Sequence, residues 1–136
     1  AVNAVDLVLD CSDDFATREA VNRACVAARK PLVSGAAIRL EGQLSVFDSR
    51  QSASPCYHCL YGHGSEEELT CSEAGVIGPL VGLVGSLQAL EALKVLAGFG
   101  EPLVGRLLLI DALSTRFREL RVKRDPACSV CGTGHE

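Results

Sequence analysis

Two Cys-x2-Cys pairs constrain the fold of this chain more than any other feature of its sequence. The first pair is Cys56 and Cys59, and the second is Cys128 and Cys131. Two thiolates at this spacing can bind one metal ion from a single tight turn, and two such turns complete a tetrahedral site of four sulfurs, which favours zinc. Such a site leaves no ligand position open, so its metal would be structural. The pairs therefore predict a fold that brings residues 56–59 and 128–131 together.

The long stretch between the two pairs does not argue against a metal site. Compared with a zinc ribbon, a loop about four times longer adds only about 1.2 kcal/mol of closure entropy. A structural zinc site contributes roughly 10–16 kcal/mol. Two other interpretations remain open, namely redox dithiols and buried structural cysteines. His58 and His63 lie near the first pair, and we expect them to be bystanders because four thiolates already complete the site.

Composition indicates a single globular domain and excludes several classes of function. The 136 residues are 48% apolar and 22% charged, which is typical of a folded domain. The net charge is −4 and aromatic residues are only 4%, so a nucleic-acid-binding surface is not expected. Seven cysteines are an odd number, which excludes complete disulfide pairing and favours a cytoplasmic protein. The chain contains no methionine, so we expect it to be a piece of a longer or processed protein.

The pattern of apolar and polar residues predicts an α/β fold. An apolar run at 5–9 indicates a buried parallel strand, and residues 17–29 carry apolar positions at helical spacing after helix-start residues. A second strand is expected to begin at 32–34 and to be broken by Gly35. The remaining strands are predicted at 38–47 (a half-exposed strand or hairpin with a break at Gly42), 107–110 and 115–122.

A stretch without charged residues, 74–90, predicts a long apolar helix that ends at 98–100. The stretch falls just short of a membrane span, and Glu91 and Lys94 continue its helical pattern. We therefore expect a buried helix of an α/β protein and no membrane. The helix contains glycines at spacings of three and four, which would let another backbone approach closely. They fit helix-on-sheet packing or a subunit interface, and they are Gly75, Gly78, Gly82 and Gly85.

Three carboxylates, Asp10, Asp13 and Asp14, cluster where the first strand meets the first helix. Ligands of open α/β sheets bind outside the carboxyl ends of parallel strands, and a helix N-terminus there attracts anions. Carboxylates beside a phosphate would hold Mg²⁺, and Arg18 could pair with an acidic residue or a phosphate. Plain helix capping by Asp13 or Asp14 explains the cluster equally well. No glycine-rich nucleotide motif is present, so these residues alone do not predict a nucleotide.

Cys71 is the one unpaired cysteine in a loop-like sequence, between an acidic stretch and the apolar helix. A thiol near a helix N-terminus has its thiolate favoured. A nucleophilic or sulfur-transfer role and an ordinary cysteine are both compatible with this position. Cys11 and Cys25 lie in apolar sequence, and we expect them in the core.

Five segments of the chain, in this order, resemble the ThiF/MoeB/HesA family of adenylyltransferases, the bacterial relatives of ubiquitin-activating enzymes. The resemblance runs over nearly the whole chain, and the segments are DLVLDCSDDFATREAVNRAC, PLVSGAAIRLEGQLSVF, PCYHCL, TCSEAGVIGPLVGLVGSLQALEALKVLAG and CSVCG. It implies a Rossmann-like α/β domain with a mixed sheet and a homodimer. The family's glycine-rich ATP loop and phosphate-binding Arg and Lys residues have no counterpart here. Residues 1–136 are thus expected to be the C-terminal portion of a single such domain.

The resemblance also implies roles for individual residues. The family's strand-end aspartate, which serves Mg·ATP during adenylation, falls on Asp13. The next residue is usually asparagine in the family and is Asp14 here. A loop cysteine that forms a thioester or acyl-disulfide in some members falls on Cys71. The family's zinc ligands fall on Cys56, Cys59, Cys128 and Cys131.

The implied function is activation of a small ubiquitin-like sulfur-carrier protein in molybdopterin or thiamine biosynthesis. In the family, the carrier's C-terminal Gly-Gly carboxylate attacks the α-phosphate of ATP, and sulfur later displaces AMP to give a thiocarboxylate. The isolated 136 residues are expected to be inactive alone, because the ATP loop lies outside them. Two alternatives are a non-catalytic, zinc-stapled module that binds a protein partner and a dithiol oxidoreductase.

Overall fold

The computed structural model describes residues 1–62 and 75–132 of the chain. Within them, five strands form one sheet in the order β1-β2-β3-β4-β5. β1 and β2 are parallel, and every other neighbouring pair is antiparallel, which confirms the predicted mixed sheet. The strands are β1 (Val8–Asp10), β2 (Leu32–Ile38), β3 (Glu41–Phe47), β4 (Arg106–Asp111) and β5 (Arg116–Arg121).

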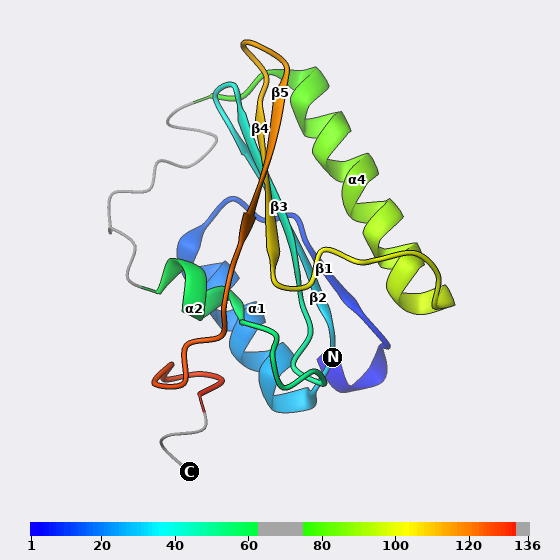
Figure 1. Cartoon of the computed structure of the whole chain (residues 1–136), viewed down its shortest axis with the longest axis vertical. Helices are drawn as coiled ribbons and strands as arrows, with labels where there is room; N and C mark the ends of the chain where they lie inside the picture. The colour runs from blue at the N-terminus through cyan, green and yellow to red at the C-terminus, as the bar shows by residue number, and fades with distance from the viewer. Residues whose placement is uncertain (63–74, 133–136) are drawn as a thin grey trace.

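Helices cover both faces of the sheet (Figure 1). On one face, α4 (Gly78–Ala97) packs against β2 and β3, where Val33 and Val46 form the core with Ala92. On the other face, α1 (Phe15–Ala28) and α2 (Tyr57–Tyr61) enclose Leu32 and Phe47. Successive residues of a strand point to opposite faces, which is why neighbours such as Leu32 and Val33 belong to different cores. A short 3-10 helix, η1 (Val2–Ala4), lies near the N-terminus.

Two glycines expected to break strands lie inside strands instead. Gly35 pairs with Leu44, so β2 continues past it to Ile38, and the chain turns at 39–40, where Arg39 has a φ of 54°. Gly42 pairs with a residue on each neighbouring strand. A Cβ on Gly42 would lie 2.9 Å from Val84 Cγ2, so this glycine lets α4 lie close to the sheet. The predicted breaks at both glycines were wrong. Each glycine makes room for a side chain of helix α4 beside the sheet, and neither glycine forms a turn.

The long apolar helix begins later than predicted, at Gly78, and ends before Gly98, whose φ is 71°. It is the one helix among the described residues that is long and apolar enough to cross a membrane. One face is buried on the sheet and includes the polar side chains of Gln88 and Glu91. The opposite face exposes apolar side chains, with Leu93 56% accessible. The expectation of a fully buried helix therefore holds on one side only.

Candidate functional site

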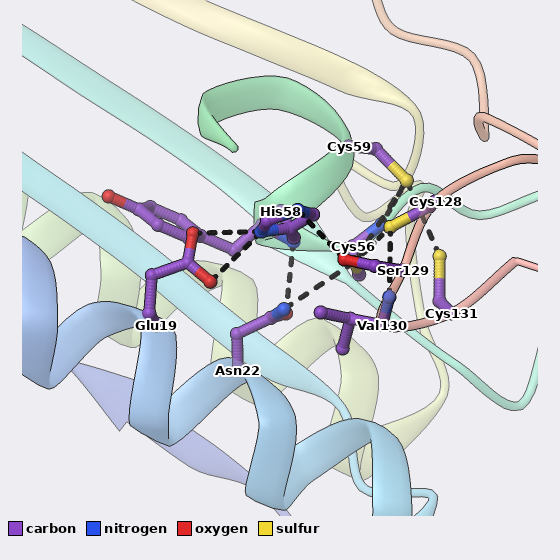
Figure 2. A network of polar contacts seen from close by, with 10 residues as sticks. Glu19, Asn22, Cys56, His58, Cys59, Cys128, Ser129, Val130 and Cys131 are labelled. Carbon is purple, nitrogen blue, oxygen red and sulfur yellow. Dashed lines mark hydrogen bonds and ion pairs between the residues drawn. The ribbon is translucent and has the colours of Figure 1, made fainter. Parts of the chain in front are cut away.

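The four paired cysteines converge on one point, as their spacing predicts (Figure 2). All four sulfurs lie within 4.8 Å of one another. The Sγ atoms of Cys56 and Cys59 are 3.9 Å apart, those of Cys56 and Cys128 are 3.7 Å apart, and those of Cys59 and Cys131 are 3.3 Å apart. Tetrahedral zinc with bonds of about 2.3 Å to sulfur would separate its ligands by about 3.8 Å. The arrangement therefore fits a single metal ion such as zinc, and it favours this over two separate dithiols.

Hydrogen bonding among the thiols shifts their pKa values in opposite directions. The hydrogen bond from Cys56 lowers the pKa of the Cys59 thiol to about 4, and the same contact raises the pKa of Cys56. Burial raises the pKa of the Cys131 thiol to about 11. Simultaneous deprotonation of the four thiols is therefore unfavourable, because each thiolate raises the pKa of the neighbouring thiols. A divalent cation would remove that opposition, so the electrostatics of the cluster also fit a metal ion.

Tight turns place the sulfurs of each pair. Cys56 is the N-cap of α2, and the amide of Cys59 donates to its carbonyl at 3.1 Å, so the two thiols lie one turn apart. In the second pair, the Cys128 amide donates to the Asp125 carbonyl and the Gly132 amide donates to the Cys128 carbonyl. A Cβ on Gly132 would lie 2.5 Å from that carbonyl oxygen, so the second turn has room for glycine alone at this position.

Helix α1 contributes two side chains, Asn22 and Glu19, to the network of polar contacts beside the cluster (Figure 2). Asn22, only 1% exposed, donates from Nδ2 to the Cys56 sulfur at 3.4 Å. The Glu19 carboxylate lies 3.0 Å from Nδ1 of His58, and Nε2 of His58 lies 3.1 Å from the Ser129 hydroxyl. His58 is thus occupied by Glu19 and Ser129 and is not one of the four clustered residues, in line with its expected bystander role. His63 lies outside the described residues.

We predict that Asn22→Leu weakens zinc binding, because this side chain donates a hydrogen bond to the Cys56 sulfur, one of the four that could hold a metal ion. Such outer contacts typically contribute about 10–100-fold in metal affinity. The measurement is the zinc dissociation constant of the full-length protein in competition with a chromophoric chelator. Ser45→Ala is the matched control, because it removes the hydrogen bond of a buried side chain to the Arg106 carbonyl away from the cysteines. Equal zinc affinities for Asn22→Leu and the unmodified protein would contradict the prediction.

The strand-end carboxylates have three different environments. The Asp10 side chain is buried and accepts hydrogen bonds from the Ser12 amide and hydroxyl at 2.9 and 2.6 Å. Asp14 is the N-cap of α1, and its hydrogen bonds with Thr17 lower the pKa of its carboxyl group. Asp13 is exposed and lines a cavity of about 710 Å³. Capping therefore belongs to Asp14, which leaves Asp13 as the carboxylate available to a ligand.

The cavity beside Asp13 is lined by residues from the sheet and from helices on both of its faces. Its lining includes Ser34 and Gln43 from the sheet, Tyr57 from α2 and Gln88 from α4. A volume of about 300–1,000 Å³ is usual for small-molecule sites, so the cavity is large enough for a ligand of that class. Neither Gln88 nor the tyrosine was identified from the sequence as a site residue. The one amide side chain within a stretch without charged residues is the signal that could have identified Gln88.

The remaining predicted residues have mixed outcomes. Arg18 is buried and donates to the Ser34 hydroxyl and to the carbonyls of Ser12 and Gly35, and all three of these acceptors are neutral groups of the protein. Cys25 is buried as predicted, and burial raises the pKa of its thiol to about 11. Cys11 is exposed, so its predicted core position was wrong, because β1 ends at Asp10. Cys71 lies outside the described residues.

Helices on both faces of a mixed sheet define a Rossmann-like α/β domain, and in this one four cysteines form a cluster. The chain belongs to the ThiF family, which matches residues 1–130. It is 54% identical over 127 residues to the molybdopterin-synthase adenylyltransferase of Escherichia coli, covering 93% of this chain and 51% of that protein. It is 51% identical over 132 residues to the sulfur carrier protein adenylyltransferase of Thermus thermophilus, covering 93% of this chain and 49% of that protein.

Solved structures share the fold at low sequence identity. The crystal structure of E. coli MccB superimposes with a TM-score of 0.77 at 19% identity, over 96% of this chain and 40% of that chain. The same protein solved with ATP gives a TM-score of 0.73 at 20% identity, over 93% of this chain and 40% of that chain. The chain spans about half the length of the curated relatives above.

Proposed function

We propose that the protein containing this chain adenylylates the C-terminal carboxylate of a small ubiquitin-like sulfur-carrier protein. Family membership and the names of its relatives support an adenylyltransferase. The observation that carries the proposal within this chain is the position of Asp13. This carboxylate follows a strand of the parallel pair, it lines the cavity, and capping of α1 falls to its neighbour Asp14.

The proposed adenylation step requires only ATP and the carrier's C-terminal carboxylate as reactants. An oxygen of the carrier's C-terminal carboxylate attacks the α-phosphorus of ATP, the bond to the bridging oxygen of the β-phosphate breaks, and pyrophosphate leaves with that electron pair. The product of this step is an acyl-adenylate. In a later step a hydrosulfide or thiolate from a separate sulfur donor attacks the acyl carbon, the bond to the phosphate oxygen breaks, and AMP leaves. The Asp13 carboxylate is an oxygen ligand suited to Mg²⁺, which when bound would neutralise phosphate charge. This chain's part is to hold that carboxylate beside the cavity and to admit an extended carrier tail.

Each cysteine group has its own place in this proposal. Cys56, Cys59, Cys128 and Cys131 would hold structural zinc and take no part in bond making. Cys71 is proposed to carry the activated carrier. Its thiolate, or a persulfide placed on it by a separate sulfur donor, attacks the acyl carbon of the adenylate, AMP leaves, and a thioester or an acyl-disulfide forms. The relatives named for molybdopterin synthesis favour that pathway, and thiamine synthesis is the second candidate. We also infer a cytoplasmic location, because four metal-binding thiols require a reducing compartment.

The proposal is tested by exchange of labelled pyrophosphate into ATP with the full-length protein. We expect exchange to depend on a carrier that ends in Gly-Gly, and to be lost when the carrier's last residue is removed. We expect no exchange by the isolated 136-residue chain. Thermal stabilisation of the full-length protein by the carrier but not by Mg·ATP would instead favour the non-catalytic protein-binding module.

We further propose that the outer face of α4 forms a homodimer interface. Added Cβ atoms at Gly78, Gly82 and Gly85 would meet nothing within 4 Å in the described residues. Leu93 and Leu96 are each more than half exposed on the same helix. A contiguous apolar face of this kind marks an interaction surface, and the small residues would let two helices approach closely.

We predict that Leu93→Glu in the full-length protein converts a dimer into a monomer, because a charge would be buried at the interface without a partner. The measurement is the molar mass by light scattering after size-exclusion chromatography. Arg118→Glu, an exposed charge change on strand β5, is the control and should leave the mass unchanged. A dimer that survives Leu93→Glu with normal stability would place the interface elsewhere.

A further inference from the structure

Strand β1 leaves the sheet just before Asp13. Its last pair with β2 joins Asp10 to Ser34, whereas β2 continues to Ile38. Within the described part of the chain, residues 11–13 have no ladder pairing with β2 to fix their position. Two side chains from helices on opposite faces of the sheet bridge β1 and β2 at this point.

The first bridging side chain is Arg18 from α1, which is 6% exposed. One nitrogen, Nη2, donates to the carbonyl of Ser12 on the departing segment and to the carbonyl of Gly35 on β2, the latter at 2.7 Å. The other, Nη1, donates to the Ser34 hydroxyl at 3.2 Å. The guanidinium thus connects Ser12, the residue immediately before Asp13, to the neighbouring strand. A lysine has a single ammonium group and would make fewer of these hydrogen bonds at once.

The second bridging side chain is Gln88 from α4, which is 3% exposed. Its Nε2 donates to the carbonyl of Asp10 at 3.0 Å and lies 3.4 Å from that of Val33, while its Oε1 lies 3.6 Å from the Cys11 sulfur. A Cβ on Gly35 would lie 2.3 Å from Gln88 Cδ. The glycine therefore leaves room for this amide, and Gln88 holds the last residues of β1 from the face opposite Arg18.

We propose that Arg18 and Gln88 are positioning residues that fix the Asp13 carboxylate for adenylation. The proposal rests on the proposed function of Asp13. Ser12 on one side of Asp13 is held by Arg18 and by the Asp10 side chain, and Asp14 on the other side is fixed as the helix cap. Asp13 thus extends from a short segment anchored at both ends. A displacement of about 1 Å in such a group can cost about 10²-fold in rate.

The test is Gln88→Glu in the full-length protein, assayed by carrier-dependent pyrophosphate exchange. Glutamate keeps the shape of the side chain but replaces the donor that faces the Asp10 carbonyl with an acceptor. We expect kcat to fall about 10- to 100-fold, the KM values for ATP and carrier to stay within about twofold, and half-maximal exchange to require more Mg²⁺. Arg18→Lys is a second, independent variant, and we expect a smaller loss of kcat with the same unchanged KM values.

Glu91→Gln is the matched control on the same helix. Glu91 is as buried as Gln88, but its carboxylate accepts from the Leu103 amide and pairs with Lys94. We expect its kcat to match that of the unmodified protein. Zinc content and thermal unfolding, recorded for every variant, report whether each has folded.

The outcomes separate this inference from the proposed function. If Asp13→Asn leaves pyrophosphate exchange unchanged, the proposed role of Asp13 is wrong, and the positioning role of Arg18 and Gln88 is wrong with it. If Asp13→Asn abolishes exchange while folded Gln88→Glu and Arg18→Lys keep normal kcat, only the positioning role is overturned. Loss of folding in both positioning variants would also overturn it, because the two side chains would then support the whole domain and not one carboxylate.

Discussion

Cys128→Ser in the full-length protein is expected to prevent zinc binding and to unfold the region around the cluster. The Cys128 sulfur lies 3.7 Å from that of Cys56 and is buried. A structural zinc site contributes roughly 10–16 kcal/mol, which equals or exceeds the whole stability of an ordinary domain, about 5–15 kcal/mol. Without one ligand, the remaining thiols would be buried with no cation between them, and the segments around both pairs would separate.

The measurements are metal content by mass spectrometry and thermal unfolding followed by circular dichroism. We expect one zinc per chain in the unmodified protein, and a loss of stability when a strong chelator removes it. Cys11→Ser is the matched control, because this thiol is exposed and outside the cluster. One equivalent of zinc in Cys128→Ser, or an unchanged unfolding temperature after chelation, would show that the four thiols do not form a structural metal site.

Asp13→Asn is expected to reduce carrier-dependent pyrophosphate exchange by about 10²-fold or more, because loss of a preorganised group that stabilises transition-state charge has effects of this size. The substitution keeps the shape of the side chain and removes the negative charge that would bind Mg²⁺. Folding should be unaffected, because Asp13 is exposed and the helix cap is its neighbour Asp14. The measurement is initial-rate exchange at saturating ATP and carrier.

Asp14→Asn is the control that isolates the role of Asp13. Asparagine caps a helix as well as aspartate does, so the hydrogen bond to the Thr17 amide should remain. The net charge changes by the same amount in the two variants. We expect Asp14→Asn to exchange pyrophosphate normally, and equal losses in both variants would show that general charge, not the Asp13 position, governs the reaction.

The convergence of the cysteines was predictable because two closely spaced thiols on each of two turns have few other uses. Residue type and spacing alone did not separate Asp13 from Asp14, since capping and metal binding favour the same residue type at the same place, and only the family resemblance pointed to Asp13. The Thr17 contacts of Asp14 show which of the two caps the helix. The glycines were misinterpreted for a related reason. Gly35 and Gly42 make room for Gln88 and Val84 of a distant helix, and local sequence does not record such contacts.

Helix α1 joins two regions of the molecule that the sequence shows as unrelated. Arg18 reaches the segment before Asp13, while Glu19 and Asn22 reach His58 and Cys56. Because the proposed function places adenylation beside Asp13 and zinc between the cysteines, we expect any substitution that rotates or shifts this helix to slow adenylation and to weaken zinc retention together. In a genetic screen, alleles in α1 should combine the adenylation defect of Asp13 alleles with the zinc-binding defect of cysteine alleles. A growth medium poor in zinc should make the defect of α1 alleles more severe before it affects the unmodified protein.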